Sequence, residues 1–316
     1  MTTDGKPDSD DPSVASSSGP DEPTDYQEWL AGSGDWLDLE PETRQVRAAF
    51  VELCRRASAK EIVTALEAIW LLLDRAALWV SSIQTDVAAN SSGLVDGTCA
   101  ALMPTISRQM RSLTYLGRSS VDYLPTAMAA ARAAFEVGLR LTWINTPEDH
   151  EERKIRVLRL HNDQARWKNA VARDYDRSSA GGDRWRRAAQ VQAALVGREL
   201  GNISWTGQLQ KPPSVSAQLH ELDLDRLYSG YRLASEYVHG GLSSALETEA
   251  VRAERSPFGI YWPNDWSLAV LMCAWGCRFS TRHYAGRGFN LGPLRGSMLA
   301  AELMLLSPGP GWRQNE

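Results

Sequence analysis

The sequence predicts an all-α fold, an irregular bundle of several helices that follows a disordered acidic N-terminal tail. Three observations favour this class. Apolar residues recur at spacings of three and four from Pro41 onward, which is the period of a helix face. No alternation of apolar and polar residues longer than five positions indicates a strand. The 316 residues are 43% hydrophobic and 23% charged, which is typical of a globular protein that buries a core.

The N-terminal tail is the first element, and it is expected to be disordered. The first 40 residues hold eleven Asp and Glu residues and one Lys, a net charge of −10, so the other 276 residues must carry +5 to give the whole-chain charge of −5. Residues 1–25 are rich in Asp, Ser, Pro and Gly and have few apolar side chains to offset the entropy of ordering. The mildly basic remainder falls short of the charge of a dedicated DNA-binding domain.

A series of helices is expected between residues 41 and 306. Pro41 suits a helix start, because its missing N–H costs nothing there, and the run 46–54 then keeps one apolar face. The apolar run 60–89 predicts one long helix or a pair of helices, and a polar Gly-containing stretch ends it. Residues 201–215 contain two prolines and are expected to be irregular. Further helices are expected over 100–116, 120–144, 147–175, 184–200, 222–238, 265–284 and 297–306.

We expect these helices to form one domain over residues 26–306, with a candidate internal boundary near 200–215 and a loose C-terminal tail over 307–316. No internal repeat at a fixed period is evident. Cys273 and Cys277 are four residues apart on an apolar helix with no set of four zinc ligands, and they are expected in the core. The sequence has no targeting signal and no apolar run that could span a membrane, so we expect a cytoplasmic protein without a membrane partner.

A polar stripe on the helix over 222–238 and its C-terminal end carries the first candidate site. A phenol, a guanidinium, a hydroxyl and an imidazole fall within about 60° of one another, from Tyr228, Arg232, Ser235 and His239. The expected apolar stripe beside them consists of Leu227, Tyr231, Ala234 and Val238. Arginine binds a phosphate through two parallel hydrogen bonds, and histidine exchanges protons near pH 7. Arg232 and His239 are therefore candidate catalytic residues for metal-independent cleavage of a phosphodiester.

A second polar stripe lies in the apolar helix over 120–144 and consists of Arg132, Glu136, Arg140 and Trp143. Charged groups are costly to bury unless they are paired. An internal pair between Arg132 and Glu136, or a hydrogen bond from the other stripe to Glu136, would satisfy this requirement without any function. A polar binding site between the two helices would also satisfy it. Both interpretations predict that the two helices pack together, and the candidate binding residues are Arg132, Glu136, Tyr228, Tyr231 and Ser235.

The two stripes together resemble an uncharacterised bacterial all-helical family. Its members pair an Arg-x3-Glu helix with a later Tyr-x3-Ser-x3-His-Gly helix. The matching residues here are Arg132 and Glu136, followed by Tyr231, Ser235 and His239 with a Gly after it, and the resemblance covers about residues 120–245.

A looser resemblance is to the HEPN superfamily of helical nucleases and nucleotide-binding domains. It rests on the Arg232-x6-His239 spacing. The resemblance implies metal-independent RNA cleavage by an Arg/His pair that is usually duplicated across a dimer. The chain departs from the pattern at Leu233, where a polar residue is usual, and in the 77 residues that follow the His. Both departures put the nuclease function in doubt.

Three interpretations therefore remain open. The chain is a HEPN-like, defence-associated protein that binds or cleaves RNA, or a non-catalytic module that binds a partner or ligand, or a domain whose polar cluster only specifies packing. The Arg-to-His spacing alone does not decide, because Arg156–His161 and Arg278–His283 match it as well. Enzymatic activity is therefore left undecided. Candidate partners are RNA or a nucleotide and a second copy of the chain, and no cofactor or metal is expected.

A basic segment over residues 153–187 is a further candidate surface. It holds eleven Lys and Arg residues and four Asp residues, with Trp167, Tyr175 and Trp185 interleaved. Basic side chains with aromatic neighbours can follow a nucleic-acid backbone and stack on its bases. A solvated helix face in an arginine-rich chain has the same composition, so both interpretations stay open.

Overall fold

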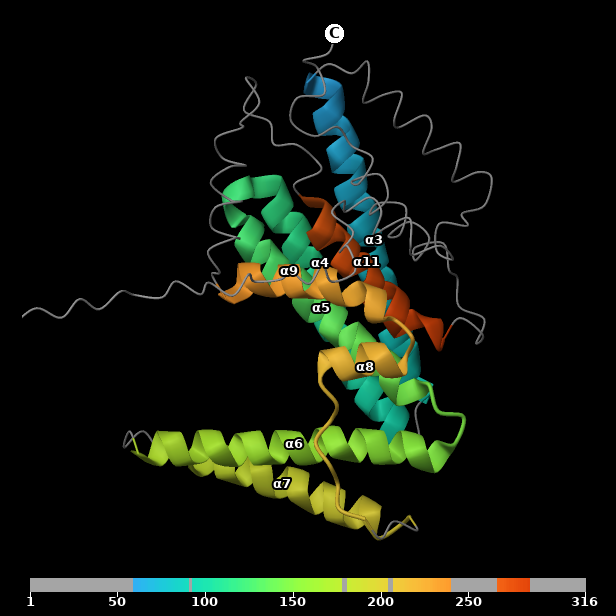
Figure 1. The fold of residues 1–316 in the computed structure, drawn as a ribbon, viewed down its shortest axis with the longest axis vertical. Helices are drawn as coiled ribbons and strands as arrows, with labels where there is room; N and C mark the ends of the chain where they lie inside the picture. Colours follow the sequence, from blue (N-terminus) through green and yellow to red (C-terminus); the bar gives the residue numbers. More distant parts are fainter. Residues whose placement is uncertain (1–58, 91–92, 178–180, 204–206, 240–265, 285–316) are drawn as a thin grey trace, which may run out of the picture. The chain divides into compact units, whose positions relative to one another are not determined.

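The computed structural model describes residues 59–90, 93–177, 181–203, 207–239 and 266–284 (Figure 1). Within these ranges the chain forms α-helices and two 3₁₀ turns and no strand, which confirms the all-α class. The helices are α3 (Ala59–Asn90), α4 (Leu94–Ser119), α5 (Leu124–Asn145), α6 (His150–Arg177), α7 (Asp183–Leu200), α8 (Val215–Glu221), α9 (Tyr228–His239) and α11 (Ser267–Arg282). The expected acidic tail, the helices over 46–54 and 297–306 and the C-terminal tail lie outside the described residues. No described helix has both the length and the apolar character needed to cross a membrane.

The prediction of one helix over 222–238 is wrong at its N-terminal end. The hydroxyl of Ser214 accepts a hydrogen bond from the Ala217 N–H at 3.2 Å and caps α8, which already begins at residue 215. Asp223 then adopts φ 56°, in the left-handed region that interrupts a helix. A 3₁₀ turn follows, and α9 begins at Tyr228. The first polar stripe therefore occupies the whole of a short helix rather than the second half of a longer one.

Helix α5 contacts α4, α6, α8, α9 and α11, and it crosses α11 at the level of the backbone. A Cβ atom on Gly138 would lie 2.3 Å from the carbonyl oxygen of Gly276, and a Cβ atom on Gly276 would lie 2.6 Å from that of Ala134. Only glycine fits at both positions. Beside this crossing, Phe135 and Phe279 meet edge to face with ring centroids 5.6 Å apart. The crossing fixes which side of α5 faces α9.

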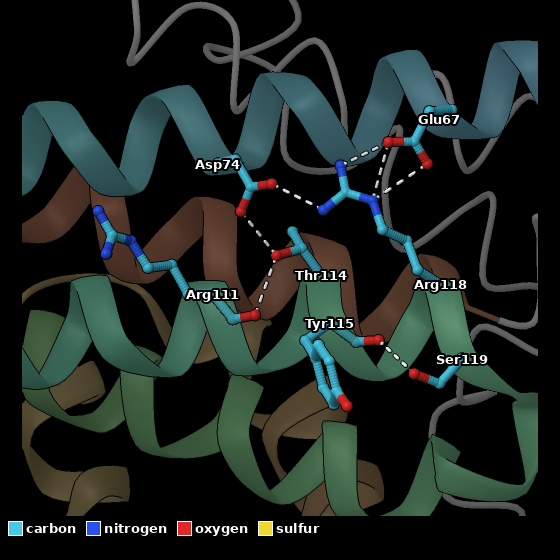
Figure 2. A network of polar contacts seen from close by, with 7 residues as sticks. All are labelled: Glu67, Asp74, Arg111, Thr114, Tyr115, Arg118 and Ser119. Atoms are coloured by element: carbon cyan, nitrogen blue, oxygen red, sulfur yellow. Dashed lines mark hydrogen bonds and ion pairs between the residues drawn. The ribbon is translucent and has the colours of Figure 1, made fainter.

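The packing of α4 on α3 includes a polar network around Arg118 (Figure 2). Arg118 donates from Nη1 to Asp74 Oδ2 at 2.7 Å and from Nε to Glu67 Oε1 at 2.9 Å, and Thr114 Oγ1 donates to Asp74 Oδ1 at 2.7 Å. The hydrogen bond to Glu67 raises the pKa of Arg118, although burial opposes it. Partly exposed ion pairs contribute at most about 1 kcal/mol each. The network therefore sets the register of α4 on α3 more than it stabilises the fold.

Helix α11 is buried along most of its length, and Cys273 and Cys277 lie in this core as expected. Burial raises the pKa of the Cys273 thiol. The thiol is therefore protonated at neutral pH and acts as a small apolar group.

Helices α6 and α7 form a hairpin (Figure 1). Its seam is apolar, because Leu158, Ala165 and Ala172 of α6 are buried, as are Ala189 and Val196 of α7. The hairpin is joined to the rest by side chains such as Arg156, which donates from Nη1 to the Trp143 carbonyl oxygen of α5 at 2.6 Å. Much of the hairpin's remaining surface is exposed.

We expect Gly138→Ala to destabilise the protein, because its new Cβ atom meets backbone that cannot move aside. Overpacking costs about 1–3 kcal/mol, which exceeds the roughly 1 kcal/mol that alanine gains in helix propensity. The matched control is Gly197→Ala on α7, where a Cβ atom meets nothing within 4 Å, and it should leave stability equal or raised. Urea unfolding followed by circular dichroism measures both. Equal stability of Gly138→Ala and the parent would contradict the close crossing.

Candidate functional site

The two polar stripes meet where α5 packs against α9, as the sequence predicts. Arg132 donates from Nε to Glu136 Oε1 at 2.8 Å and from Nη2 to the Tyr231 phenol oxygen at 2.9 Å. Tyr231 in turn donates its phenol proton to Glu136 Oε1 at 3.0 Å. The side chains of Arg132 and Glu136 are 18% and 27% exposed. We call these three residues the closed triangle, because each of its polar groups has a partner within it.

Aromatic contacts hold Tyr231 in this position. Its ring is stacked against Phe135 at 6.1 Å and against Tyr228 at 6.2 Å, measured between centroids. The guanidinium carbon of Arg132 lies 4.9 Å from the centroid of the same ring, a cation–π distance. Tyr231 therefore joins α9 to α5 through its ring, which contacts Phe135 and Arg132, and through its hydroxyl.

Burial and charge shift the ionisation of the closed triangle in one direction. Burial lowers the pKa of Arg132, but its hydrogen bond to Glu136 and the carboxylate charge outweigh burial and raise that pKa overall. Burial, together with the charge of Glu136, also raises the pKa of Tyr231. The phenol thus stays protonated and the guanidinium stays charged at neutral pH. Both hydrogen bonds to Glu136 end at its Oε1 atom.

His239 lies at the open side of the triangle. Its Nε2 atom is 3.4 Å from Arg132 Nη1, and the residue is exposed. A guanidinium can only donate hydrogen bonds, so Nε2 accepts and carries the lone pair in this arrangement. The neutral ring then has its proton on Nδ1.

The rest of the first stripe faces solvent to different degrees. Arg232 is exposed and makes no hydrogen bond or ion pair with the described residues. Tyr228 is 37% exposed and touches the site only through its ring. Ser235 donates its hydroxyl proton to the Tyr231 carbonyl oxygen at 2.9 Å, within its own helix. The structure therefore brings Tyr231 and His239 to Arg132 and Glu136, while Arg232 stays outside the cluster.

The apolar stripe expected beside these residues is partly wrong. Val238 is 40% exposed, whereas Gly230 and Tyr237 are buried together with Leu227 and Ala234. The buried face of α9 thus includes Gly230 and Tyr237 in place of Val238. Tyr231 consequently lies at the rim of the buried face, where its hydroxyl reaches polar partners.

The four residues of the second stripe do not share one site, because Arg140 and Trp143 contact other parts of the fold than Arg132 and Glu136 do. Trp143 donates from Nε1 to Glu221 Oε2 of α8 at 2.8 Å, away from the triangle. Arg140 lines a cavity of about 720 Å³ together with His161 and Lys211, and its Nε atom is buried with no hydrogen-bond partner among the described residues. The expected polar site between the two helices therefore holds for Arg132 and Glu136 only.

A polar network around His161 of α6 has no signal in the sequence. The Nε2 atom of His161 lies 3.0 Å from Thr98 Oγ1 of α4, and its Nδ1 atom contacts the Gln192 side-chain amide of α7. Lys168 donates to the oxygen of that amide at 2.9 Å, so the amide nitrogen faces the ring. Burial, and next the charge of Lys168, lowers the pKa of His161. The lowered pKa favours the neutral form of His161, and its ring links α6 to α4 and α7.

The comparisons with known proteins add one finding. Residues 98–250 match the model of a family described as "Family of unknown function (DUF5677)". The match covers slightly less than half of the chain and includes the whole of α5 and α9. Over this span the chain is similar to a family without an assigned function. No curated protein and no solved structure matches the chain significantly.

We expect Tyr231→Phe to lower the free energy of unfolding by about 1–2 kcal/mol, because Arg132 Nη2 loses its acceptor inside a partly buried cluster. The matched control is Tyr115→Phe, since that ring is 72% exposed and its hydroxyl makes no hydrogen bond with the described residues. The control should stay within about 0.5 kcal/mol of the parent. Chemical denaturation measures both variants. A Tyr231→Phe protein as stable as the control would show that the hydroxyl does not hold the helices together.

The network of His161 predicts a loss of stability in acid. Since the folded protein lowers the pKa of His161, the unfolded chain binds a proton more readily near the ordinary pKa of 6.5. Stability contributed by this residue is therefore present above pH 6.5 and is lost as the pH falls below it. His161→Gln should flatten the decline of the unfolding free energy between pH 7 and pH 5, whereas His150→Gln, at an exposed position, should not. Equal slopes in the parent and His161→Gln would contradict this assignment.

Proposed function

We propose that this chain binds RNA at the exposed side of α9 and cleaves a phosphodiester bond there without a metal ion. The observation that carries the proposal is the division of the polar cluster into a closed and an open half. The closed triangle satisfies its own hydrogen bonds, whereas Arg232 and His239 stay exposed on the same helix. A cluster with a purely structural role would seal these two side chains as well. Their HEPN-like spacing supports the same proposal.

The proposed chemistry uses the lone pair on His239 Nε2. The 2′-hydroxyl of the RNA attacks the adjacent phosphorus, and its proton passes to Nε2. The bond between phosphorus and the 5′-oxygen breaks, and the imidazolium returns the proton to that oxygen. Arg232 neutralises the charge that builds up on the non-bridging phosphoryl oxygens. The products are a 2′,3′-cyclic phosphate and a 5′-hydroxyl, and DNA, which lacks the 2′-hydroxyl, is not a substrate.

The geometry allows Arg232 and His239 to act on one phosphate. Seven residues of a helix rise about 10 Å and turn the chain by nearly two full turns, so both side chains start from the same face. Each is long enough to reach toward the space above Ser235, which lies between them. Arg132 Nη1 lies 3.4 Å from His239 Nε2, so this contact must open before Nε2 takes the proton from the 2′-hydroxyl.

A non-catalytic module that binds a phosphate-bearing or acidic ligand is the second candidate function. One observation favours it: the described site supplies a single imidazole, so the same group must serve as base and acid. In that case Arg232 and His239 bind the ligand without chemistry. The two candidate functions involve the same class of ligand, and they differ only in whether the bound ligand is cleaved.

One substitution tests the proposal. His239→Ala should reduce cleavage of a single-stranded RNA by about 10²- to 10⁴-fold, because the proton shuttle is removed. Its melting temperature should match that of the parent, since the ring is exposed. His220→Ala is the matched control, because His220 is also exposed and contacts only Asp225 of its own turn. The assay contains EDTA and analyses the product ends, with a DNA strand of the same sequence as a second substrate.

The possible outcomes separate the two functions. Cleavage in EDTA that yields cyclic phosphate ends and disappears in His239→Ala supports the nuclease. A parent protein that leaves RNA intact but binds it, with weaker binding in Arg232→Gln, supports the non-catalytic module instead. Cleavage by His239→Ala at the parental rate contradicts the role of this residue.

A further inference from the structure

Helix α6 carries a short pattern in which similar residues recur every seven positions. The pattern occurs three times. Each time an Arg is preceded directly by an apolar residue and is followed, three positions later, by a polar residue. The arginines are Arg159, Arg166 and Arg173, the polar residues are Asn162, Asn169 and Asp176, and the apolar residues are Leu158, Ala165 and Ala172. The apolar residues are all buried in the α6–α7 seam. Since seven residues make nearly two turns, each set forms a stripe along the helix.

The arginine stripe lies about 100° around α6 from the buried stripe, and its members are about 10 Å apart along the axis. Arg166 and Arg173 are exposed, and neither makes a hydrogen bond or an ion pair with the described residues. Arg159 has a buried Nε atom that also has no hydrogen-bond partner among them. We call these three residues, with Asn162 and Asn169 beside them, the arginine ladder.

Four other arginines of the hairpin, Arg156, Arg177, Arg186 and Arg198, differ because each has an acidic partner. Arg177 pairs with Asp174, and Arg156 pairs with Glu152 and Glu221. Asp176, at the end of the polar stripe, is already bound by Arg186, which also contacts Asp183. Asp163 lies about one turn of α6 from Arg159 and Arg166, but no ion pair joins it to either of them among the described residues. The charges of the ladder repel one another and add nothing to folding.

The middle of the ladder borders a hollow. A cavity of about 470 Å³ is lined by Arg166, Asn169, Ala172, Arg173, Asp176 and Arg186. It is open to solvent between α6 and the start of α7. Guanidinium and carboxamide groups donate hydrogen bonds to phosphate oxygens and ribose hydroxyls, and this hollow contains both kinds of group.

We propose that the arginine ladder of α6 binds the phosphate backbone of single-stranded RNA. The inference rests on the proposed function for its choice of RNA, and it assigns the binding surface to a helix other than the one that carries the reaction. Charge complementarity supports it: a row of unpaired cations at regular spacing fits a regular polyanion better than a single small anion.

Exposed aromatic rings of the same hairpin favour a single strand. Trp167 directly follows Arg166 and is 56% exposed, and its ring meets Trp185 edge to face at 5.5 Å. Tyr175, which is 43% exposed, lies 6.4 Å from Trp185 between centroids. Unpaired bases stack on such rings, whereas the bases of a duplex are inaccessible to them. The ladder and the aromatic group together match the requirements of a single strand.

The test measures binding of a fluorescein-labelled single-stranded RNA of 12 nucleotides by anisotropy. All proteins are full-length and carry His239→Ala, so the RNA stays intact whether or not the parent cleaves it. Arg166→Gln/Arg173→Gln should weaken binding about tenfold or more and lower the salt slope of log K by roughly 1.4, about 0.7 for each lost phosphate contact. The matched control is Arg177→Gln/Arg198→Gln, which removes the same charge from exposed arginines that pair with acids. The control should bind within about twofold of the parent.

Further arms decide between the ligands. Trp167→Ala should weaken binding about fivefold or more by loss of stacking, and circular dichroism should confirm that every variant is folded. Equal weakening by the ladder and control variants overturns the inference, as does tighter binding of a duplex or of single-stranded DNA. If the wild-type protein cleaves RNA, and Arg166→Gln/Arg173→Gln binds as tightly as the His239→Ala protein and, with His239 retained, cleaves as fast as wild type, the ladder assignment fails and the proposed function stands. If the ladder binds RNA and the parent never cleaves it, the ladder assignment stands and the nuclease fails.

Discussion

The contact between Gly138 of α5 and Gly276 of α11 constrains the rest of the described fold. Two helices whose backbones touch cannot slide or rotate without a clash, so the orientation of α5 is set at this point. Arg132 and Glu136 lie about 140° around α5 from Gly138, which places them opposite α11. The glycine contact in the apolar core thus determines that these charges face α9. The site depends on a packing constraint that contains no functional residue.

Burying charges on α5 requires partners, and Tyr231 provides the one that joins the two helices. A phenylalanine there would fill the same space against Phe135 but would leave Arg132 Nη2 without an acceptor. The hydroxyl both accepts from Arg132 and donates to Glu136, so a single group closes the triangle. Since Arg132 has further donors, Nη1 remains to face His239. Arg132 thus belongs to the closed triangle and also contacts His239 of the candidate site.

Local features of the sequence were sufficient to predict much of this fold. The apolar period locates α3, α5 and α7 within a few residues, and two polar stripes predict that α5 and α9 pack together. The break at Asp223 was missed, because a left-handed residue without glycine leaves no clear mark in the sequence. Which face of α9 is buried depends on how the helix packs in the fold, and no local pattern contains that information. The pairing of Trp143 with Glu221 joins residues 78 positions apart, and a single sequence holds no signal for such contacts.

The arginines of the described helices fall into two groups, and only one is explained by folding. Arg118, Arg132, Arg156 and Arg186 each have carboxylate partners on the same or a neighbouring element, and they orient the helices. Arg166, Arg173 and Arg232 have none among the described residues, so they add repulsion without a compensating contact. An unpaired arginine on a helix surface is ordinary when it is isolated. A regular row of them beside asparagines and a hollow carries positive charge that no ion pair among the described residues neutralises, and the polyanion proposed above would supply the missing counter-charge.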